Sequence, residues 1–377
     1  MTTTQGFTTE AFQPVRDLLE QSLNSGGDLG ASVAVHHRGD VVVDIWGGYA
    51  DPAKTKLWQS DTITNVWSTT KTMTFLVALL LMDRGELDFD APVARYWPEF
   101  AQNGKNDVKI RHLLSHTAGL SGWSDDLKPE DLADWDRCVT ALAEQAPWWE
   151  PGTQSGYHAI TQGYLLGEVY RRITGLSFGA LLRQEFTEPL GADFHVGLDE
   201  KDESRVSLVV PPPAVDFSQY DPNSIQVRTL SSPPLDGAMP HNRWWRAAEI
   251  PAANGHGNAR SVALLQSIIT NRGETGGKRF LKSETVDRIF VTEAEGRDLV
   301  LDMPMHFGAG YGLGSETVPI GPRACFWGGF GGSLIIMDQE SDLTVSYMMN
   351  RMDVGLVGDT RGFMIALTAA GAAANVL

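Results

Sequence analysis

The sequence predicts an α/β protein of the α+β type, in which an antiparallel sheet made from both chain ends is flanked by helices and carries an inserted, mainly helical subdomain. Two observations predict this. Strand patterns occur between residues 31 and 46 and return after residue 325. The stretch between them, from about residue 68 to residue 191, is mostly helical.

This pattern divides the 377 residues into two parts, and the chain is long enough for a substantial core. We expect residues 1–67 and 255–377 to form the α/β domain, with a sheet made from both termini. Residues 68–254 are expected to form the helical subdomain, and the active-site cleft is expected between the two.

The first strands are predicted to form a hairpin. Residues 32–37 and 41–46 have strand composition and flank Arg38, Gly39 and Asp40, which have the chemistry of a hairpin turn. The remaining elements of this domain are two strands and a closing helix, predicted at residues 333–337, 343–350 and 363–374.

The middle of the chain contains a run at residues 73–82 that is apolar in every direction, which predicts a helix buried in the interior. It is too short to span a bilayer, which needs about 20 residues. Residues 209–251 are proline-rich and irregular, so they form either a pocket wall or a plain structural connection. Further helices are predicted at residues 109–114, 161–173, 178–186 and 261–271.

The composition is that of an ordinary globular protein, with 42% hydrophobic and 20% charged residues. The formal net charge of −17 argues against binding to nucleic-acid phosphates or to anionic membrane surfaces. The N-terminal residues lack the basic region and apolar core of a secretory signal. We therefore expect a cytoplasmic protein that binds neither nucleic acid nor membranes, and the sequence leaves its oligomeric state open.

No metal or cofactor site is expected. Cys138 and Cys325 lie far apart and lack metal-ligand or redox spacing, so two reduced thiols are favoured over a disulfide. No cluster of His, Cys and carboxylate residues has zinc spacing. The glycines at 308–314 lack the βαβ context of a dinucleotide loop, and a strand with close backbone contacts is predicted there.

The strongest candidate for chemistry is Ser68, which lies three residues before Lys71 at the start of the buried helix. Residues at this spacing share one helix face, so the two side chains can meet. A nucleophilic serine needs a group that takes its proton, and a lysine kept neutral in a dry site can help. The helix N-terminus also favours the negative charge that develops there.

Two further motifs are candidate partners of Ser68. Tyr157 is a poor base in water because a phenol has a pKa near 10, but a neighbouring lysine ammonium favours the phenolate, which then accepts the serine proton. The glycine-rich segment 327–332 precedes the C-terminal strands, where an exposed edge N–H can stabilise an oxyanion. Taken alone, each motif is more simply an ordinary structural feature.

Taken together and in this order, the three motifs resemble those of the class C β-lactamase and penicillin-binding protein superfamily. Residues 113–120 and 150–157 resemble further segments of that superfamily. The resemblance extends over roughly residues 30–350 and implies a serine β-lactamase-like fold.

The resemblance also implies a role for each motif. Ser68 would be the nucleophile, and Lys71 and Tyr157 would form the base pair that activates it and later activates the hydrolytic water. The backbone N–H groups of Ser68 and Phe330 would form the oxyanion hole.

Two departures from the class C pattern bear on the substrate. The usual Lys-Thr-Gly is replaced by a tryptophan and two glycines at 327–329, and the asparagine of the usual Tyr-x-Asn is replaced by Ala159. The missing lysine and asparagine would hold a carboxylate and an amide of the substrate. The Trp-Gly-Gly motif is similar to that of family VIII carboxylesterases, which implies an apolar pocket for uncharged esters. The residues expected to bind substrate are Trp327, Gly328, Gly329 and Trp123.

Other candidates are set aside. Ser177 lies in a G-x-S-x-G pattern, but that motif needs a preceding strand, whereas a helix precedes it here and Gly175 is the expected C-cap. His116 and His256 are interpreted as hydrogen-bonded structural histidines.

We therefore predict a serine carboxylesterase that hydrolyses small, short-chain or aromatic esters through an acyl-enzyme on Ser68. A β-lactamase, a D-alanyl-D-alanine peptidase or an amidase would use the same residues. A non-catalytic binding protein is the alternative outside the enzymes, and it would be expected to have lost some of the motif residues.

Overall fold

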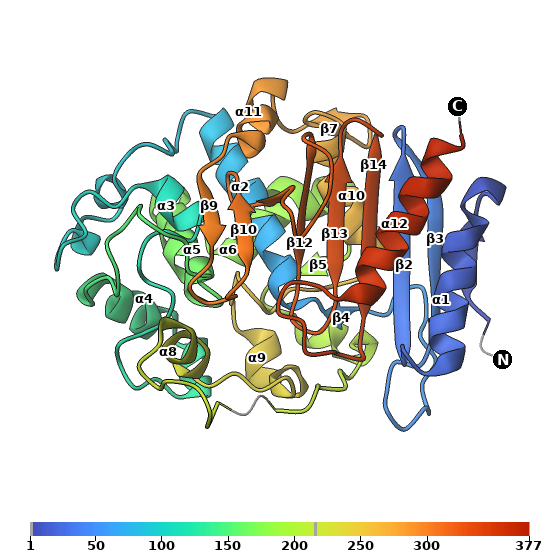
Figure 1. Cartoon of the computed structure of the whole chain (residues 1–377), viewed down its shortest axis with the longest axis horizontal. Helices are drawn as coiled ribbons and strands as arrows, with labels where there is room; N and C mark the ends of the chain where they lie inside the picture. The colour runs from blue at the N-terminus through green and yellow to red at the C-terminus, as the bar shows by residue number, and fades with distance from the viewer. Residues whose placement is uncertain (1–2, 215–216, 377) are drawn as a thin grey trace.

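The computed structural model describes residues 3–214 and 217–376, and its centre is a nine-stranded antiparallel sheet (Figure 1). The strand order is β1-β3-β2-β14-β13-β12-β11-β10-β9, so both chain ends contribute strands, as predicted. The strands are β1 (Gln5–Thr8), β2 (Gly30–His37), β3 (Asp40–Gly48), β9 (Ala294–Arg297), β10 (Pro304–Phe307), β11 (Gly312–Leu313), β12 (Ala324–Gly328), β13 (Leu334–Asp338) and β14 (Leu343–Met349).

The predicted hairpin is formed by β2 and β3, with His37 opposite Asp40. Arg38 and Gly39 have φ angles of 55° and 85°, the two positive values that a type I′ hairpin turn requires. The two ends of the chain meet where β14 pairs with β2, with Met349 opposite Ala31.

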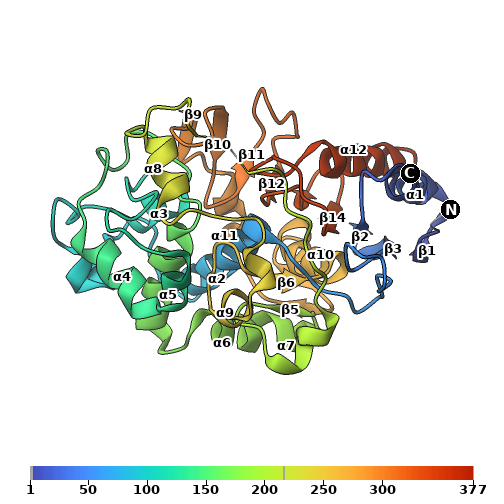
Figure 2. The ribbon, with the colours of Figure 1, turned by 90° about the horizontal axis from the view of Figure 1, so that it is seen from below.

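Helices cover the sheet on both faces. α1 (Gln13–Ser25) and α12 (Thr360–Ala374) lie against each other on one face, and α10 (Ala259–Thr270) packs against β2, β13 and β14 on the other (Figures 1 and 2). α1 buries Val15, Leu19 and Leu23, which recur every four residues and so form one apolar stripe. The fold class predicted from the sequence is confirmed.

The remaining helices lie mostly beside the sheet, around the buried helix α2 (Lys71–Asp83). Residues 71–81 of α2 are all buried, as its apolar character on every side predicted. The Tyr170 hydroxyl donates to the carbonyl of Thr74 on α2 at 3.0 Å. The other helices are α3 (Ile110–Leu114), α4 (Trp135–Glu144), α5 (Thr161–Thr174), α6 (Phe178–Leu182), α7 (Glu188–Leu190), α8 (Ile225–Ser231), α9 (Arg243–Ala247) and α11 (Ser283–Asp287).

Several short elements were not predicted. The helix expected at 178–186 ends at Leu182 and continues as a π turn (Arg183–Thr187). A three-stranded sheet joins β4 (Thr64–Asn65), β6 (His256–Gly257) and β5 (Phe194–His195), and a two-stranded one joins β7 (Glu274–Thr275) and β8 (Lys278–Arg279). Strands of two residues carry no period that a sequence can display, so they are recognised only from their tertiary pairing.

Two further observations concern membrane-spanning helices and the cysteines. Among the described residues, no helix is both long and apolar enough to cross a membrane. Cys138 and Cys325 are buried and unpaired, as the sequence favoured.

The junction between the chain ends depends on Asn350, which is fully buried. Its Oδ1 accepts from the Gly30 N–H at 3.0 Å, and its Nδ2 donates to the Tyr49 carbonyl at 3.0 Å. We expect Asn350→Ala to lower the free energy of unfolding by about 1–3 kcal/mol, because it leaves both backbone groups unpaired. Asn375→Ala, which removes an exposed amide at the end of α12, is the control. Equal stability of the two variants in urea denaturation would contradict the prediction.

Candidate active site

Ser68 lies in a single 3₁₀ turn (Trp67–Thr70) that leads into α2, and only 7% of its surface is exposed. The preceding residue, Trp67, has a φ of 48°, a left-handed conformation that is uncommon outside glycine. The Thr70 hydroxyl holds this turn because it donates to the Trp67 carbonyl at 2.5 Å and accepts from the Gly255 N–H at 2.9 Å. Strained backbone of this kind persists where the surrounding structure fixes it, and it concentrates at functional sites.

Lys71 is completely buried one helical turn from Ser68. Its Nζ lies 3.2 Å from Ser68 Oγ and donates to the carbonyls of Ala159 and Ala252 at 2.7 and 3.0 Å. Burial holds the pKa of Lys71 well below its usual value, because the ammonium loses its hydration. A neutral amine has two N–H donors, which the two carbonyls accept, and its lone pair is then free to face Ser68 Oγ.

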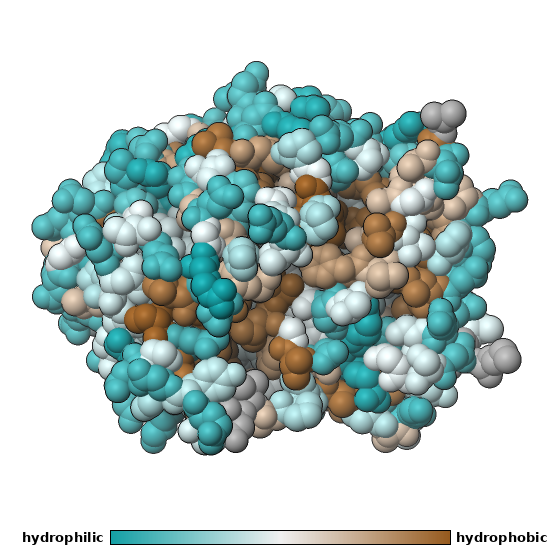
Figure 3. All heavy atoms as spheres, in the orientation of Figure 1, coloured by the Kyte–Doolittle hydropathy of each residue, from teal (hydrophilic) through white to brown (hydrophobic). Residues whose placement is uncertain are grey.

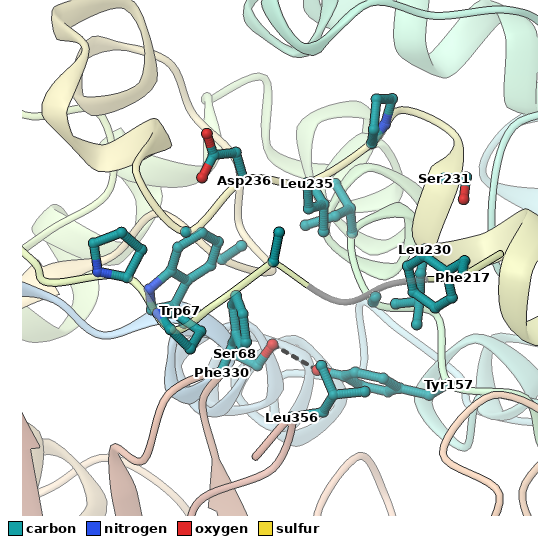
Figure 4. A pocket seen from close by; sticks show the side chains of 18 of the residues that line it. Trp67, Ser68, Tyr157, Phe217, Leu230, Ser231, Leu235, Asp236, Phe330 and Leu356 are labelled. Atoms are coloured by element: carbon teal, nitrogen blue, oxygen red, sulfur yellow. Dashed lines mark hydrogen bonds between the residues drawn. The ribbon is translucent and has the colours of Figure 1, made fainter. Parts of the chain in front are cut away.

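Tyr157 approaches Ser68 from the other side, with its hydroxyl 2.5 Å from Ser68 Oγ (Figure 4). Burial raises the pKa of Tyr157, although its contacts with Ser68 and Trp327 oppose that rise. The same burial lowers the pKa of Lys71, so the dry site favours a neutral phenol beside a neutral amine. The sequence suggested a phenolate beside an ammonium, and the burial of both groups favours the uncharged form of each.

The glycine-rich third motif lies against the turn that carries Ser68. A Cβ added at Gly329 would come within 2.4 Å of the Val66 carbonyl and 3.1 Å of the Ser68 backbone nitrogen. The Ser333 hydroxyl fixes this contact, since it lies 2.8 Å from the Val66 carbonyl and 2.9 Å from the Thr69 hydroxyl. Only glycine allows the two backbones to approach so closely.

The residues on the two sides of this contact, Ser68 and Phe330, both line the pocket. Within the described part of the chain, neither the Ser68 N–H nor the Phe330 N–H donates a hydrogen bond to another residue. Phe330 lines the pocket next to Ser68 (Figure 4). Two unused N–H donors beside a serine hydroxyl are chemically suited to binding an oxyanion.

Ser68 and Tyr157 lie at the base of a pocket of about 450 Å³. Its far wall is the proline-rich stretch that the sequence left undecided between a pocket wall and a plain connection. Apolar side chains gather around this hollow in the space-filling view (Figure 3). The main apolar lining residues are Trp67, Ile160, Pro211, Pro212, Pro213, Phe217, Leu230, Pro234, Leu235, Phe330 and Leu356.

Residues 15–369 match the family described as Beta-lactamase. The chain belongs to the β-lactamase family. This membership confirms the resemblance inferred from the three motifs, and with it the predicted enzyme class, a serine hydrolase.

Several known proteins are similar to this chain over nearly its whole length. It is 35% identical to the Esterase/beta-lactamase LipL of Mycobacterium tuberculosis over 361 residues, which cover 89% of this chain and 80% of that protein. A crystal structure of a family VIII carboxylesterase is 37% identical, with a TM-score of 0.92 over 98% of this chain and 99% of that one. A penicillin-binding protein homologue from Caulobacter crescentus is 34% identical, with a TM-score of 0.89 over 98% and 99% of the two chains.

The sequence predicted that Trp327 and Trp123 bind substrate. Neither of them lines the pocket. Trp327 is buried behind Tyr157, with their ring centroids 5.6 Å apart, and it stacks on His116 at 5.8 Å. Trp123 is buried among helices, where its indole N–H donates to the Cys138 carbonyl at 3.0 Å. Trp327 therefore supports the tyrosine, and Trp67 is the tryptophan that lines the pocket.

The residues set aside from the sequence have structural partners. The Ser177 hydroxyl donates to Glu249 and caps the N-terminus of α6, and Gly175 ends α5 with a φ of 74°. His116 Nδ1 accepts from the His158 N–H at 3.0 Å, and His256 Nδ1 lies 2.8 Å from the Asn254 carbonyl. Among the described residues, no group of three or more His, Cys, Asp or Glu side chains is arranged to hold a metal ion.

Sequence reasoning did not find Asp298, which is buried and fixes the Tyr157 backbone. Its Oδ1 accepts from the N–H groups of Tyr157, Val300 and Leu301 at 2.9 to 3.0 Å. The chain contains 47 acidic residues, and Asp298 has no motif that distinguishes it from the others. Only the folded chain brings it to the tyrosine.

We expect Asp298→Ala to lower kcat at least about tenfold and the free energy of unfolding by about 2 kcal/mol or more, because three buried N–H groups lose their acceptor. Asp298→Asn keeps an acceptor oxygen and should restore most of both. The control is Asp302→Asn in the same loop, which removes an exposed ion pair with Arg297 and keeps a residue that tolerates the φ of 55° at this position. If Asp298→Asn were as impaired as Asp298→Ala, the charge rather than the hydrogen bonds would matter.

The buried Lys71 should make stability depend on pH. Its folded pKa lies below the unfolded value, so between the two the unfolded state binds more protons and stability rises with pH. Relative to Lys71→Met, the free energy of unfolding of the wild type should rise by about 1.4 kcal/mol per pH unit in this window. Below the lowered pKa, the difference between the two proteins should not change with pH. Urea denaturation at several pH values up to about 10 measures this difference. Lys201→Met, at an exposed lysine, should show no such slope, and a flat difference for Lys71→Met would refute the prediction.

Proposed function

We propose that the protein is a serine carboxylesterase that hydrolyses small, uncharged esters with short-chain or aromatic groups through an acyl-enzyme on Ser68. The observation that carries this proposal is the position of Ser68 Oγ, within hydrogen-bond distance of both Lys71 Nζ and the Tyr157 hydroxyl at the base of an apolar pocket. The relatives named as esterases, among them EstB of Burkholderia gladioli at 26% identity over 90% of this chain, support it.

The first half of the proposed reaction forms the acyl-enzyme. Ser68 Oγ attacks the ester carbonyl carbon while its proton passes to the neutral Lys71 amine, which the two carbonyl partners hold in place. The carbonyl oxygen becomes an oxyanion at the N–H groups of Ser68 and Phe330. The bond to the alcohol oxygen then breaks, and the alcohol leaves with a proton returned by the Lys71 and Tyr157 pair.

The second half releases the acid. A water molecule takes the place of the alcohol, and the same pair accepts its proton as it attacks the acyl carbon. The second oxyanion collapses, the bond to Ser68 Oγ breaks, and Ser68 recovers its proton. Tyr157, whose hydroxyl lies 2.5 Å from Ser68 Oγ, takes part in these proton transfers as the partner of Lys71.

The charge of the pocket supports uncharged esters over β-lactams, which carry a carboxylate. Among the described residues that line it, Asp236 is the single charged side chain, and none is Lys, Arg or His. A substrate carboxylate would lose hydration without gaining a cationic partner. An apolar acyl group instead gains from contact with the proline-rich wall.

Removal of the nucleophile or of its partner tests the mechanism. Ser68→Ala should abolish hydrolysis of p-nitrophenyl butyrate, and Tyr157→Phe should lower kcat by about 10² to 10⁴, the range for a lost proton-transfer group. Ser177→Ala, in the unused G-x-S-x-G pattern, is the matched control and should keep full turnover. Full activity of Ser68→Ala, or loss of activity in a folded Ser177→Ala, would refute the assignment.

Substrate charge is tested with two acyl groups of similar length. The kcat/KM for p-nitrophenyl succinate, whose acyl group ends in a carboxylate, should be about tenfold or more below that for p-nitrophenyl butyrate. Asp236→Asn should reduce the difference in kcat/KM between the two esters, because it removes the negative charge from the pocket lining. Nitrocefin should be turned over more slowly than either uncharged ester, and a preference for nitrocefin would support a β-lactamase instead.

A further inference from the structure

A second apolar cavity lies next to the catalytic pocket. Its volume is about 480 Å³, and it is formed by the segment from the loop after β9 into β10, the loop after β11, β12, and the segment that leads into the start of α12. The proposed mechanism makes no use of it. Its apolar lining comes from Leu301, Met303, Met305, Val318, Phe326, Leu356, Val357 and Phe363.

Leu356 is the residue that lines both spaces. Its side chain is half-buried and lies between Phe330 and Tyr157 at the edge of the catalytic pocket (Figure 4). The residues on either side of it are tied to the third motif. The Gly331 N–H donates to the Gly355 carbonyl at 2.8 Å, and the Gly358 N–H donates to the Gly329 carbonyl at 3.2 Å. The turn that positions the Phe330 N–H therefore also holds the segment that carries Leu356.

We propose that Leu356 limits the length of the straight apolar chain that the enzyme accepts, because its side chain separates the catalytic pocket from the second cavity. The inference rests on the proposed esterase function and deepens it. A chain bound at Ser68 gains affinity for each methylene buried, about fourfold in kcat/KM, until it meets a wall. The second cavity lies beyond Leu356. Removal of the leucine side chain is therefore expected to join the catalytic pocket to the second cavity, so that a longer chain can be bound.

The test measures kcat/KM along two series of substrates. Straight-chain p-nitrophenyl esters from acetate to dodecanoate vary the acyl chain, and acetates of straight-chain alcohols vary the leaving group. Leu356→Ala should raise the ratio of kcat/KM for the ten-carbon chain to that for the four-carbon chain about tenfold in one of the two series, which identifies the half of the ester that points to Leu356. Leu356→Phe should lower that ratio.

The matched control is Leu230→Ala, which removes the same number of atoms from the catalytic pocket but does not line the second cavity. It should change the ratio less than about twofold. Thr317 lies in the second cavity, so Leu356→Ala combined with Thr317→Trp should cancel the gain. Equal ratios in Leu356→Ala and Leu230→Ala, or a gain that survives Thr317→Trp, would overturn the inference. Failure of the proposed function can be distinguished from failure of this inference, because in that case the wild-type protein would not hydrolyse esters at all.

Discussion

The burial of the Lys71 amine against the carbonyls of Ala159 and Ala252 is the constraint on which the rest of the site depends. A lysine in water is an ammonium and cannot accept a proton from a serine. In the interior the charged form loses its hydration, so the neutral amine is favoured and is able to act as a base. The two carbonyls then hold it in one orientation. The same burial that lowers the stability of the folded protein therefore favours the form of Lys71 that the proposed mechanism requires.

This requirement explains why segments far apart in the sequence converge on one turn. The start of α2 provides Ser68 and Lys71, while the segment before α5 provides Tyr157 and the Ala159 carbonyl. The end of β12 lies against the same turn through Gly329, and Ser333 ties the two together. These contacts hold the Ser68 hydroxyl, the Lys71 amine and the Tyr157 hydroxyl together at one turn.

The wall of the site differs from its base in structure. The base is dense, aromatic and fixed, with Trp327, His116 and Asp298 supporting Tyr157 from behind. The outer wall is a proline-rich loop with little regular structure, and a loop of this kind can vary without disturbing the catalytic groups. Recognition of the substrate is therefore separated from the chemistry, which suits a fold that hosts both esterases and β-lactamases among its relatives.

The sheet from both chain ends, the buried helix and the three motifs could be predicted from the sequence, because hydrophobic period, turn residues and short spacing are local properties. Ser68 and Lys71 share a helix face, so their proximity could be predicted. The tertiary structure alone decided that Trp327 and Trp123 lie outside the pocket, that Asp298 fixes Tyr157, and that the proline-rich loop forms a wall. The raised pKa of Tyr157 has the same origin, since burial depends on what the rest of the chain places around a residue, and no local pattern records that.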